Sequence, residues 1–420
     1  MNKEKICIVG GGVAGITAAH YLQDKYEVTL LEKNDYIGGH TNTSTVLDPE
    51  LGEIPVDTGF IVLNDKTYPG LHALLKELNV PVRWSNMSFS YHSLHDSFQY
   101  AGNNINGLFG DRKNILSPSF YRFLFDIKKF CQKALIARAT GEAESLSLAD
   151  FLKKHRILDT TRDYYILPMG AAIWSTPSDE MLKFPASTFI NFLFNHGLLA
   201  IRDRPRWQTV VGGSRSYVEA FLRSFTGKVK TQTSVTSVKR ASENIEVTYK
   251  NEKHIFDQVI FACHADTVLS LLASPSKEEE NAFSNWKYNK NHTVLHTDSS
   301  FMPQKKRLWS SWNYREERQG HLSVTYAMNI LQGIDSTTNY FVTLNPRSKI
   351  DPSKVIAQYN YTHPLYSSSS ITSQKKIADC NGIDRVWFAG SYTGYGFHED
   401  AVQSSLSVVQ SIVQQLGESV

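Results

Sequence analysis

A glycine-rich motif near the start of the sequence could bind the phosphates of a dinucleotide. Gly10, Gly12 and Gly15 follow a short apolar run and overlap the start of a helical pattern over residues 13–22. The first glycine allows a tight turn, the second lets a pyrophosphate approach the backbone, and the third lets the helix pack on the strand. Glu32 lies 22 positions after Gly10, where a carboxylate can accept hydrogen bonds from a ribose. The motif predicts dinucleotide binding and leaves NAD and FAD open.

Two later glycine-containing segments could bring further main chain against the same ligand. Gly38-Gly39 comes soon after Glu32, and Asp57-Thr58-Gly59 follows a predicted hairpin whose turn is near residues 48–50. Glycine permits a backbone to approach a ligand closely. We therefore expect Gly38-Gly39 to lie beside the ligand and not to be a plain surface turn, while the segment at Gly59 could also be a strand end with a turn.

The elements that must position these residues fall into two groups. Around the glycine motif, the apolar runs and helical patterns predict strands at 6–9, 28–31, 256–263 and 385–390, and helices at 13–22, 68–78, 217–225 and from 398 to about 416. Residues 82–100 and 286–364 instead predict strands of a second sheet. At 420 residues the chain exceeds one ordinary core, so we expect about two domains.

A helix predicted over residues 117–138 combines apolar and basic side chains. It carries a single acid, Asp126, against five cations: Arg122, Lys128, Lys129, Lys133 and Arg138. Such a helix could face a membrane or an acyl lipid. More often such a helix is a domain helix with a solvated basic face, and both interpretations stay open.

Charge and cysteine content limit the class of protein. The 44 Lys and Arg residues nearly balance the 41 Asp and Glu residues, which argues against nucleic acid as the main partner. The four cysteines form no CxxC pair, so we expect a reducing compartment and neither a disulfide framework nor a metal site. We find no signal peptide and no run long enough to span a bilayer, and expect a cytoplasmic protein, with peripheral contact at the inner membrane surface left open.

The order of the glycine motif, Glu32-Lys33 and Gly38-Gly39 resembles the N-terminus of the amine-oxidase and phytoene-desaturase-like flavoproteins, which bind FAD. The stretches around Val235 and Gly390 resemble the middle and C-terminal FAD segments of that superfamily, so the resemblance covers nearly the whole chain. It implies non-covalent FAD, because no C-terminal cysteine stands at an attachment point. The residues that it places at the cofactor are Gly10, Gly12, Val13, Ala14, Gly15, Glu32, Lys33, Gly38, Gly39, His40, Thr41, Thr58, Gly59, Phe60, Ile61, Val235, Gly390, Ser391, Phe397, His398, Glu399 and Ala401.

The resemblance also implies the fold, an α/β protein. A Rossmann-like FAD-binding domain of the GR2 type would be interleaved with an α+β substrate domain built on a mixed sheet. The FAD-binding parts are predicted at residues 1–82, 205–285 and 384–420, and the substrate parts at 83–204 and 286–383.

Three strings resemble one branch of bacterial amine-oxidase-like flavoproteins more specifically. They are Val56-Asp57-Thr58-Gly59-Phe60, Leu295-His296-Thr297-Asp298 and residues 394–400. That branch is often associated with cyclopropane-fatty-acid-synthase-type methyltransferases, and some members act on unsaturated or methylated acyl chains. The resemblance thus implies an apolar lipid substrate and a methyltransferase as partner.

Two departures from the amine oxidases bear on the chemistry. His40 stands where the superfamily usually has arginine, and no lysine is in register near His292, where amine oxidases usually hold a water against the flavin. Phe397 takes the place of a cage aromatic and would form an apolar wall. We expect a substrate cavity lined by Trp174, Phe192, Trp312, Tyr326 and Phe397. Candidates for proton transfer are His398, His296, Asp298 and His292, since imidazole titrates near neutral pH.

These residues lead to three hypotheses. The first is an FAD-dependent oxidoreductase that abstracts hydride from an unsaturated or methylated fatty acyl chain. The second is a flavin-containing amine oxidase. A lysine or a cage of negative charge at the flavin would favour this hypothesis. The third is a flavin-bound protein that binds a lipid or a partner methyltransferase without turnover.

Overall fold

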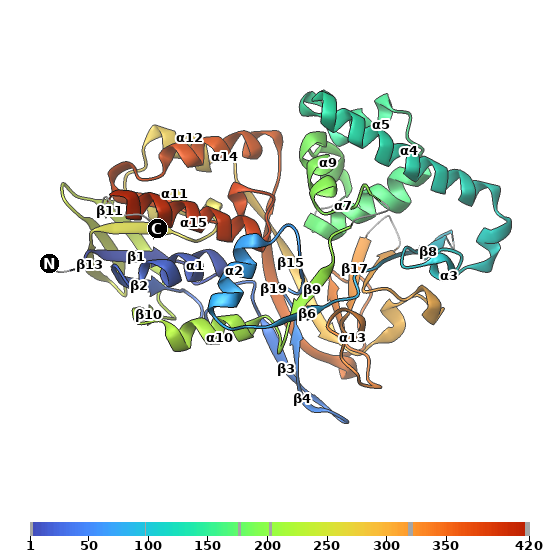
Figure 1. Cartoon of the computed structure of the whole chain (residues 1–420), viewed down its shortest axis with the longest axis horizontal. Coiled ribbons are helices and arrows are strands. Elements are labelled where there is room, and N and C mark those ends of the chain that lie inside the picture. The colour runs from blue at the N-terminus through green and yellow to red at the C-terminus, as the bar shows by residue number, and fades with distance from the viewer. Residues whose placement is uncertain (1–2, 97, 175–177, 201–203, 318–321, 416–420) are drawn as a thin grey trace.

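The computed structural model describes residues 3–96, 98–174, 178–200, 204–317 and 322–415. Two main sheets lie side by side along the length of the molecule (Figure 1). The first is a five-stranded parallel sheet in the order β10 (Lys228–Lys230), β2 (Glu27–Leu31), β1 (Lys5–Val9), β14 (Gln258–Phe261) and β20 (Val386–Phe388). Its strands come from three separate stretches of the chain.

The second main sheet has seven strands and is mixed. Its order is β19 (Val355–Leu365), β15 (Lys287–His296), β18 (Phe341–Leu344), β17 (Leu322–Ala327), β16 (Trp312–Glu316), β7 (Phe89–Ser93) and β8 (Gln99–Ala101). All neighbours are antiparallel except β16 and β7, which are parallel. The predicted α/β fold with a mixed second sheet is confirmed, while the predicted domain boundaries stay a prediction.

Three smaller sheets complete the strands. The first is antiparallel and contains β11 (Val235–Arg240), β12 (Ile245–Tyr249) and β13 (Glu252–Phe256). The hairpin of β3 (Thr43–Asp48) and β4 (Gly52–Asp57) projects from the molecule (Figure 1). The third sheet joins β5 (Leu63–Asn64), β9 (Trp207–Val210) and β6 (Val82–Trp84), which lie between the two main sheets (Figure 1).

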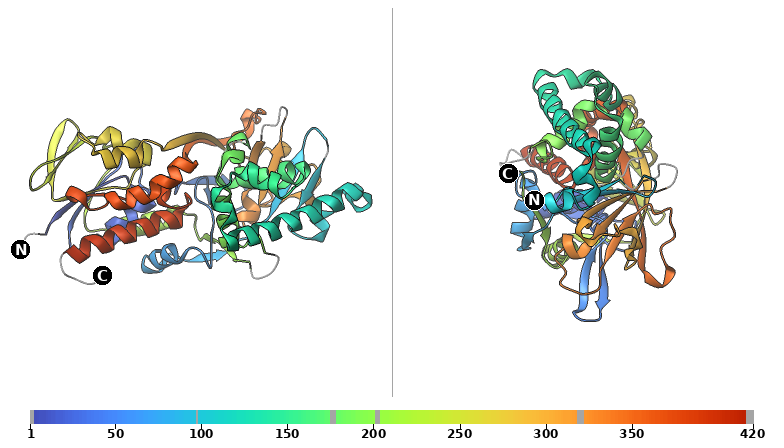
Figure 2. Two further views of the ribbon diagram at one scale, coloured as in Figure 1. Left: turned by 90° about the horizontal axis from the view of Figure 1, so that it is seen from above. Right: turned by 90° about the vertical axis from the view of Figure 1, so that its right-hand side faces the viewer.

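The helices form two sets. Those around the parallel sheet are α1 (Val13–Leu22), α2 (Pro69–Glu77), α10 (Arg215–Ser224), α11 (Ala265–Leu271), α12 (Lys277–Phe283), α14 (Ser368–Cys380) and α15 (His398–Gln415). The others are α3 (Ile105–Leu108), α4 (Pro118–Thr140), α5 (Leu148–Lys154), α6 (Asp159–Thr161), α7 (Leu167–Trp174), α8 (Ser178–Lys183), α9 (Ala186–Asn195) and α13 (Met328–Leu331). Figure 2 shows the second set, with the long α4, at the opposite end of the molecule from the parallel sheet.

Both faces of the parallel sheet are buried, which explains its continuous apolar strands. Ile6 and Ile8 pack in a cluster with α1, α2 and α15, whereas Cys7 and Val9 pack in the cluster that contains α11, α12 and α14. Burial on both faces leaves the carboxyl ends of the strands as the place where this sheet can meet a ligand. Among the described residues, no helix is long and apolar enough to cross a membrane.

Candidate cofactor and substrate site

The glycine loop after β1 has the geometry that phosphate binding needs. Gly10 has a φ of +115°, and a Cβ there would lie 2.5 Å from the carbonyl oxygen of Ala262. A Cβ on Gly15 would overlap the carbonyl oxygen of Gly10. Gly12 differs, because its φ of −76° suits any residue and a Cβ would meet nothing within 4 Å. The bare backbone of Gly12 therefore leaves room for a ligand at the N-terminus of α1, as a pyrophosphate requires.

Glu32 is held firmly at the end of β2. Its carboxylate accepts hydrogen bonds from the backbone N–H of Gly11 at 2.8 Å and of Asn34 at 2.9 Å. The side chain is buried and still lines the cavity beside the glycine loop. It is thus positioned where a ribose would follow the phosphates, although its role there stays a prediction.

A cavity of about 960 Å³ begins at the glycine loop and continues between the two main sheets. Most of the residues predicted at the cofactor line it. They are Gly10, Gly12, Val13, Ala14, Glu32, Lys33, Gly38, Gly39, His40, Thr58, Gly59, Phe60, Ile61, Val235, Gly390, Ser391, Phe397, His398 and Ala401. Segments more than 300 positions apart in the chain thus share one wall.

The other end of the cavity is apolar and aromatic. Four of the five predicted substrate-cavity residues line it: Phe192, Trp312, Tyr326 and Phe397. Phe397 stacks on Phe192 with ring centroids 4.7 Å apart, and Trp312 meets Tyr326 edge-on at 5.4 Å. Met87, Phe89, Met169, Ile173 and Leu344 extend the same wall. This end fits an alkyl or aryl group.

Three histidines that stand far apart in sequence meet on the cavity wall. The ring of His40 lies 5.0 Å from that of His363 and 6.1 Å from that of His264, and Nε2 of His40 is buried without a hydrogen-bond partner among the described residues. Burial and the neighbouring imidazoles lower the pKa of His264 and of His363 to about 3, so both are neutral at pH 7. A buried imidazole nitrogen without a protein partner on the cavity wall is free to bond a polar group of a ligand.

Only His40 of this cluster was predicted at the cofactor. His264 lies three residues after the end of β14, at the N-cap of α11, and a loop at the carboxyl edge of a parallel sheet is a signal that could have found it. His363 lies within β19, where no local motif marks it. No group of three described His, Cys, Asp or Glu side chains converges closely enough to hold a metal ion.

His398 lies on the cavity wall at the first residue of α15. Its ring stacks on Phe60 at 3.7 Å, and its Nε2 is 3.0 Å from the hydroxyl of Thr41. Burial lowers its pKa to about 3, so the imidazole is neutral at pH 7. The start of α15 also brings the positive end of the helix dipole to the cavity.

The other three candidates for proton transfer, His292, His296 and Asp298, do not line the cavity. The cavity face of the seven-stranded sheet is marked by Leu344 and Tyr326, and the antiparallel register puts Thr293 and Leu295 of β15 on that face. Successive side chains of a strand alternate between faces, so His292 and His296 point to the other side.

Their contacts fit this placement. His292 is exposed and bonds Gln358. His296 is buried between Phe301 and Phe341, accepts from the backbone N–H of Asp298 at Nδ1, and lies 2.7 Å from the Thr343 hydroxyl at Nε2. The carboxylate of Asp298 accepts from the backbone N–H groups of Ser300 and Asp351. Each of the three side chains therefore has hydrogen-bond partners within the protein, away from the cavity lining.

Four other predicted site residues lie behind the cavity wall. Gly15 packs against Gly10, and the buried hydroxyl of Thr41 bonds Tyr217 and His398. Trp174 donates to the carbonyl of Tyr395 and packs on Phe184, Phe189 and Phe192. Glu399 accepts from the backbone N–H groups of Gly70 and Leu71, so it caps α2. Each of these four residues contacts another residue that either lines the cavity or belongs to the helices around it.

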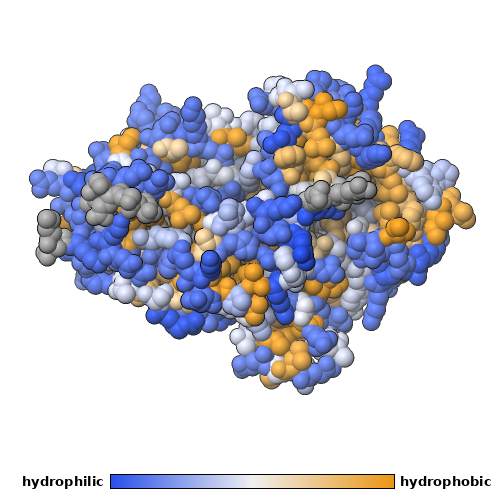
Figure 3. Space-filling model, in the orientation of Figure 1, coloured by the Kyte–Doolittle hydropathy of each residue, from blue (hydrophilic) through white to orange (hydrophobic). Residues whose placement is uncertain are grey.

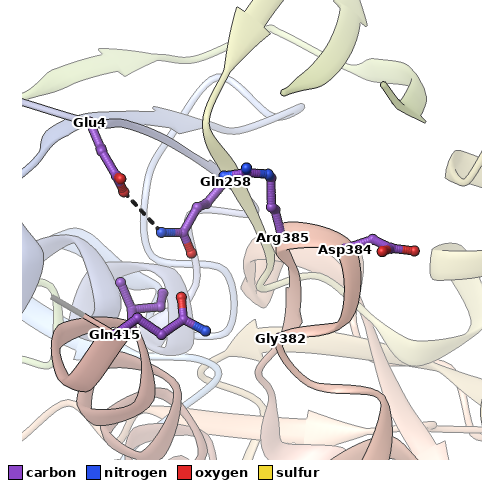
Figure 4. Close-up of a pocket in the computed structure, with 7 residues that line it drawn as sticks. Glu4, Gln258, Gly382, Asp384, Arg385 and Gln415 are labelled. Atoms are coloured by element: carbon purple, nitrogen blue, oxygen red, sulfur yellow. Dashed lines mark hydrogen bonds between the residues drawn. The ribbon is translucent and has the colours of Figure 1, made fainter. Parts of the chain in front are cut away.

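A second, shallower pocket of about 410 Å³ lies at the opposite end of the parallel strands. Glu4, Gln258 and Arg385 are among the residues that line it, and Gln258 donates to Glu4 at 3.1 Å (Figure 4). Ligands of open parallel sheets bind at the carboxyl ends of the strands, whereas these residues stand at the amino ends. This pocket is thus separate from the cofactor site.

Comparisons with known proteins agree with the fold. The family of flavin-containing amine oxidoreductases matches residues 13–413, so the chain belongs to that family and the resemblance predicted from its motifs is confirmed. Polyamine oxidase 2 of Arabidopsis thaliana is 24% identical over 317 residues, 71% of this chain and 60% of that protein. A 52-residue stretch, 12% of this chain, is 42% identical to uncharacterized protein R656 of Acanthamoeba polyphaga mimivirus and covers 10% of it. The chain spans three fifths or less of these curated relatives.

Solved structures with different substrates share the fold. A fatty acid isomerase from P. acnes that produces CLA superposes with a TM-score of 0.71 at 17% identity, over 97% of this chain and 98% of its own. Putrescine oxidase bound to putrescine superposes with a TM-score of 0.71 at 14% identity, over 98% and 99%. At these identities the likeness shows the fold alone. The family implies a flavin, and the cavity with its glycine loop fits one.

Proposed function

We propose that this protein is an FAD-dependent oxidoreductase that removes hydride from a carbon of an apolar substrate, namely an unsaturated or methylated fatty acyl chain. FAD would be held non-covalently, with its adenosine and phosphates at the glycine loop, Glu32 and Val235. When bound, it would accept the hydride and pass the electrons to O₂ or another acceptor. The chain would supply orientation, an apolar cavity and exclusion of water.

The observation that carries this proposal is the lining of the cavity's aromatic end. The charged residues among the described cavity lining are Glu32 and Lys33 at the glycine loop, and Arg204. No carboxylate therefore stands among Phe192, Trp312 and Tyr326 to balance an ammonium group. An alkyl chain gains free energy by leaving water for such a wall, whereas a cationic amine would lose hydration without a partner.

Two residues, His196 and Phe397, would shape the apolar end of the cavity where the substrate binds. His196 lines the cavity, stacks on Phe192 at 3.8 Å, and its Nδ1 lies 3.0 Å from the Phe192 carbonyl oxygen. Burial lowers its pKa to about 4, so it presents a neutral ring at pH 7. Phe397 closes the wall next to His398 at the start of α15.

The test is anaerobic reduction of the bound flavin. Holoprotein is mixed with phospholipids carrying saturated, unsaturated or methylated acyl chains, and separately with putrescine and a cyclic amine, while the visible flavin absorbance is followed. We expect bleaching by an unsaturated or methylated lipid, together with a product lighter by two hydrogens. Trp312→Ala should slow this bleaching without loss of flavin. Trp309→Ala, whose indole bonds Pro303 outside the cavity, is the matched control.

The competing functions give different outcomes. The family description and the similarity to a polyamine oxidase favour an amine oxidase as the second candidate. Bleaching by amines alone would refute the lipid substrate and support that candidate. Flavin that neither class reduces would refute both enzymes and support a protein that only binds a lipid or a partner methyltransferase.

A further inference from the structure

We propose that the outer face of α4, with the turn that precedes it, docks on the surface of an anionic lipid bilayer. The proposal rests on the proposed function for its purpose, because an acyl chain of a membrane lipid must reach the cavity. Binding to a bilayer is nevertheless measured without turnover, so the two proposals can fail separately.

The outer face of α4 exposes large apolar side chains. Phe125 is 70% exposed, Leu116 in the preceding turn is 88% exposed and Ile136 is 53% exposed, and Tyr121 and Leu135 are exposed with them. At 3.6 residues per turn, residues 121, 125 and 136 fall on one side of the helix, with Lys128 and Gln132 between them. We call Leu116, Tyr121, Phe125, Leu135 and Ile136 the outer stripe. Large apolar side chains exposed together with polar and basic residues on one helix face are typical of an interaction site.

The apolar side chains on the inner face of the same helix are already buried. Phe120, Phe123, Phe130, Ala134 and Ala137 are buried in the molecule. Ser117 caps the first turn, Pro118 occupies the first helical position, and Gly141 ends the helix with a φ of +73°. The helix is thus stable in its place without help from the outer stripe, whose exposure is not explained by folding.

The exposed, unpaired charges on α4 itself are positive. Arg122 and Lys128 are exposed on α4, and neither forms an ion pair with another described residue. The one acid of the helix, Asp126, is buried, accepts from the backbone N–H of Leu158 and lies 3.5 Å from Lys129. Its charge is therefore neutralised inside. Exposed aromatic and aliphatic side chains interspersed with unpaired cations fit the acyl and headgroup layers of an anionic bilayer.

The location of α4 connects this face with the cavity. Phe123 on the inner side of α4 packs against Tyr100 with ring centroids 5.4 Å apart, and Tyr100 lines the cavity. One layer of side chains thus separates the helix from the cavity wall. Figure 2 shows α4 along an outer edge of the molecule, and Figure 3 shows apolar side chains at the end where it lies.

A bilayer suits this face better than a second copy of the chain does. In a two-fold dimer the same patch meets itself, which would bring Arg122 and Lys128 toward the same cations of the other copy. Anionic headgroups instead provide the opposite charge along the whole face. A different protein is thus the competing occupant of this face, and the experiment below distinguishes it from a bilayer.

The experiment is co-sedimentation of holoprotein with vesicles of phosphatidylcholine, with and without phosphatidylglycerol. We expect binding to the anionic vesicles, weaker binding to neutral ones, and release at high salt. Phe125→Ser with Ile136→Ser, and Arg122→Glu with Lys128→Glu, should each weaken binding at least about tenfold. The matched controls lie at the far end of the molecule. They are Ile255→Ser on β13, 52% exposed, and Lys376→Glu on α14, and both should bind like the wild type.

Flavin content and the circular dichroism spectrum show whether each variant is folded. Failure of the folded wild-type protein to bind anionic vesicles overturns the proposal, and so does equal loss of binding in the Ile255→Ser control. Either result favours a protein partner as the occupant of this face. Vesicle binding by a protein whose flavin no lipid reduces would uphold the docking surface and refute the lipid substrate.

Discussion

At the scale of single residues, a substitution of Gly12 should abolish cofactor binding without disturbing the fold. Glycine there is required neither by the φ of −76° nor by protein contacts. We expect Gly12→Glu to fold yet be purified colourless, because its carboxylate would occupy the space of the pyrophosphate and repel its charge. Visible absorbance measures the flavin, and the thermal unfolding of the variant should match that of the wild-type apoprotein. Retained yellow colour would contradict the assigned site.

His196 gives a prediction about pH. Burial lowers its pKa to about 4 in the folded chain, against about 6.5 in an unfolded one, so between these values only the unfolded state binds the proton. The stability due to this neutral imidazole is complete above about pH 6.5 and is lost as the pH falls. Relative to His196→Leu, the wild-type apoprotein should lose up to about 2 kcal/mol between pH 7 and pH 5. Urea unfolding at both pH values measures it, and parallel curves for the two proteins would refute it.

At the scale of elements, Glu399 links two helices. Its carboxylate on α15 accepts from the backbone N–H groups of Gly70 at 2.8 Å and Leu71 at 2.9 Å in the first turn of α2. Glu399→Ala leaves these buried donors unpaired and should lower the free energy of unfolding by about 1–3 kcal/mol. Denaturant unfolding measures this loss.

The flavin content of the Glu399→Ala variant distinguishes this capping role from a direct role of Glu399 at the cofactor. Glu399→Ala should keep its full flavin content, since Glu399 lies outside the cavity wall. Glu219→Ala, an exposed site on α10, is the control and should stay within about 0.5 kcal/mol of the wild type. Loss of flavin from the folded Glu399→Ala variant would instead place this side chain at the cofactor.

At the scale of the whole molecule, the flavin should hold the two halves together. The cavity takes its walls from the parallel sheet and from the seven-stranded sheet, so a ligand there binds the folded state alone. Removing the flavin should lower Tm, and FAD at about a hundred times its Kd should restore about 2.7 kcal/mol. FMN should restore much less, because it lacks the adenosine that would reach Glu32 and Val235. Equal rescue by FMN and FAD, measured by thermal unfolding, would refute dinucleotide binding.

Much of the glycine-loop end of the cavity was predictable from the sequence, because the residues that determine its structure are close together in the chain. The tight turn at Gly10, the close packing at Gly15 and the acid at the end of β2 depend on residues within one strand–helix–strand unit. The long α4 was predictable for the same reason, since its cap, first-turn proline and apolar spacing all lie within it. Within residues 286–364, where only strands of the second sheet were predicted, Lys306–Leu308 form a turn of 3-10 helix and the strand β16 begins at Trp312.

The sequence by itself determined that a dinucleotide-binding unit begins this chain, and that a helix with basic and apolar residues follows in its middle. Only the tertiary structure decided which side chains meet the cavity. Whether His296 or Leu295 faces it depends on the register of β15 with β18, and a shift of one residue would exchange them. His40, His264 and His363 share a wall only because three distant segments converge there. Strand register and long-range packing are set by the whole core, and no short stretch of sequence encodes either one.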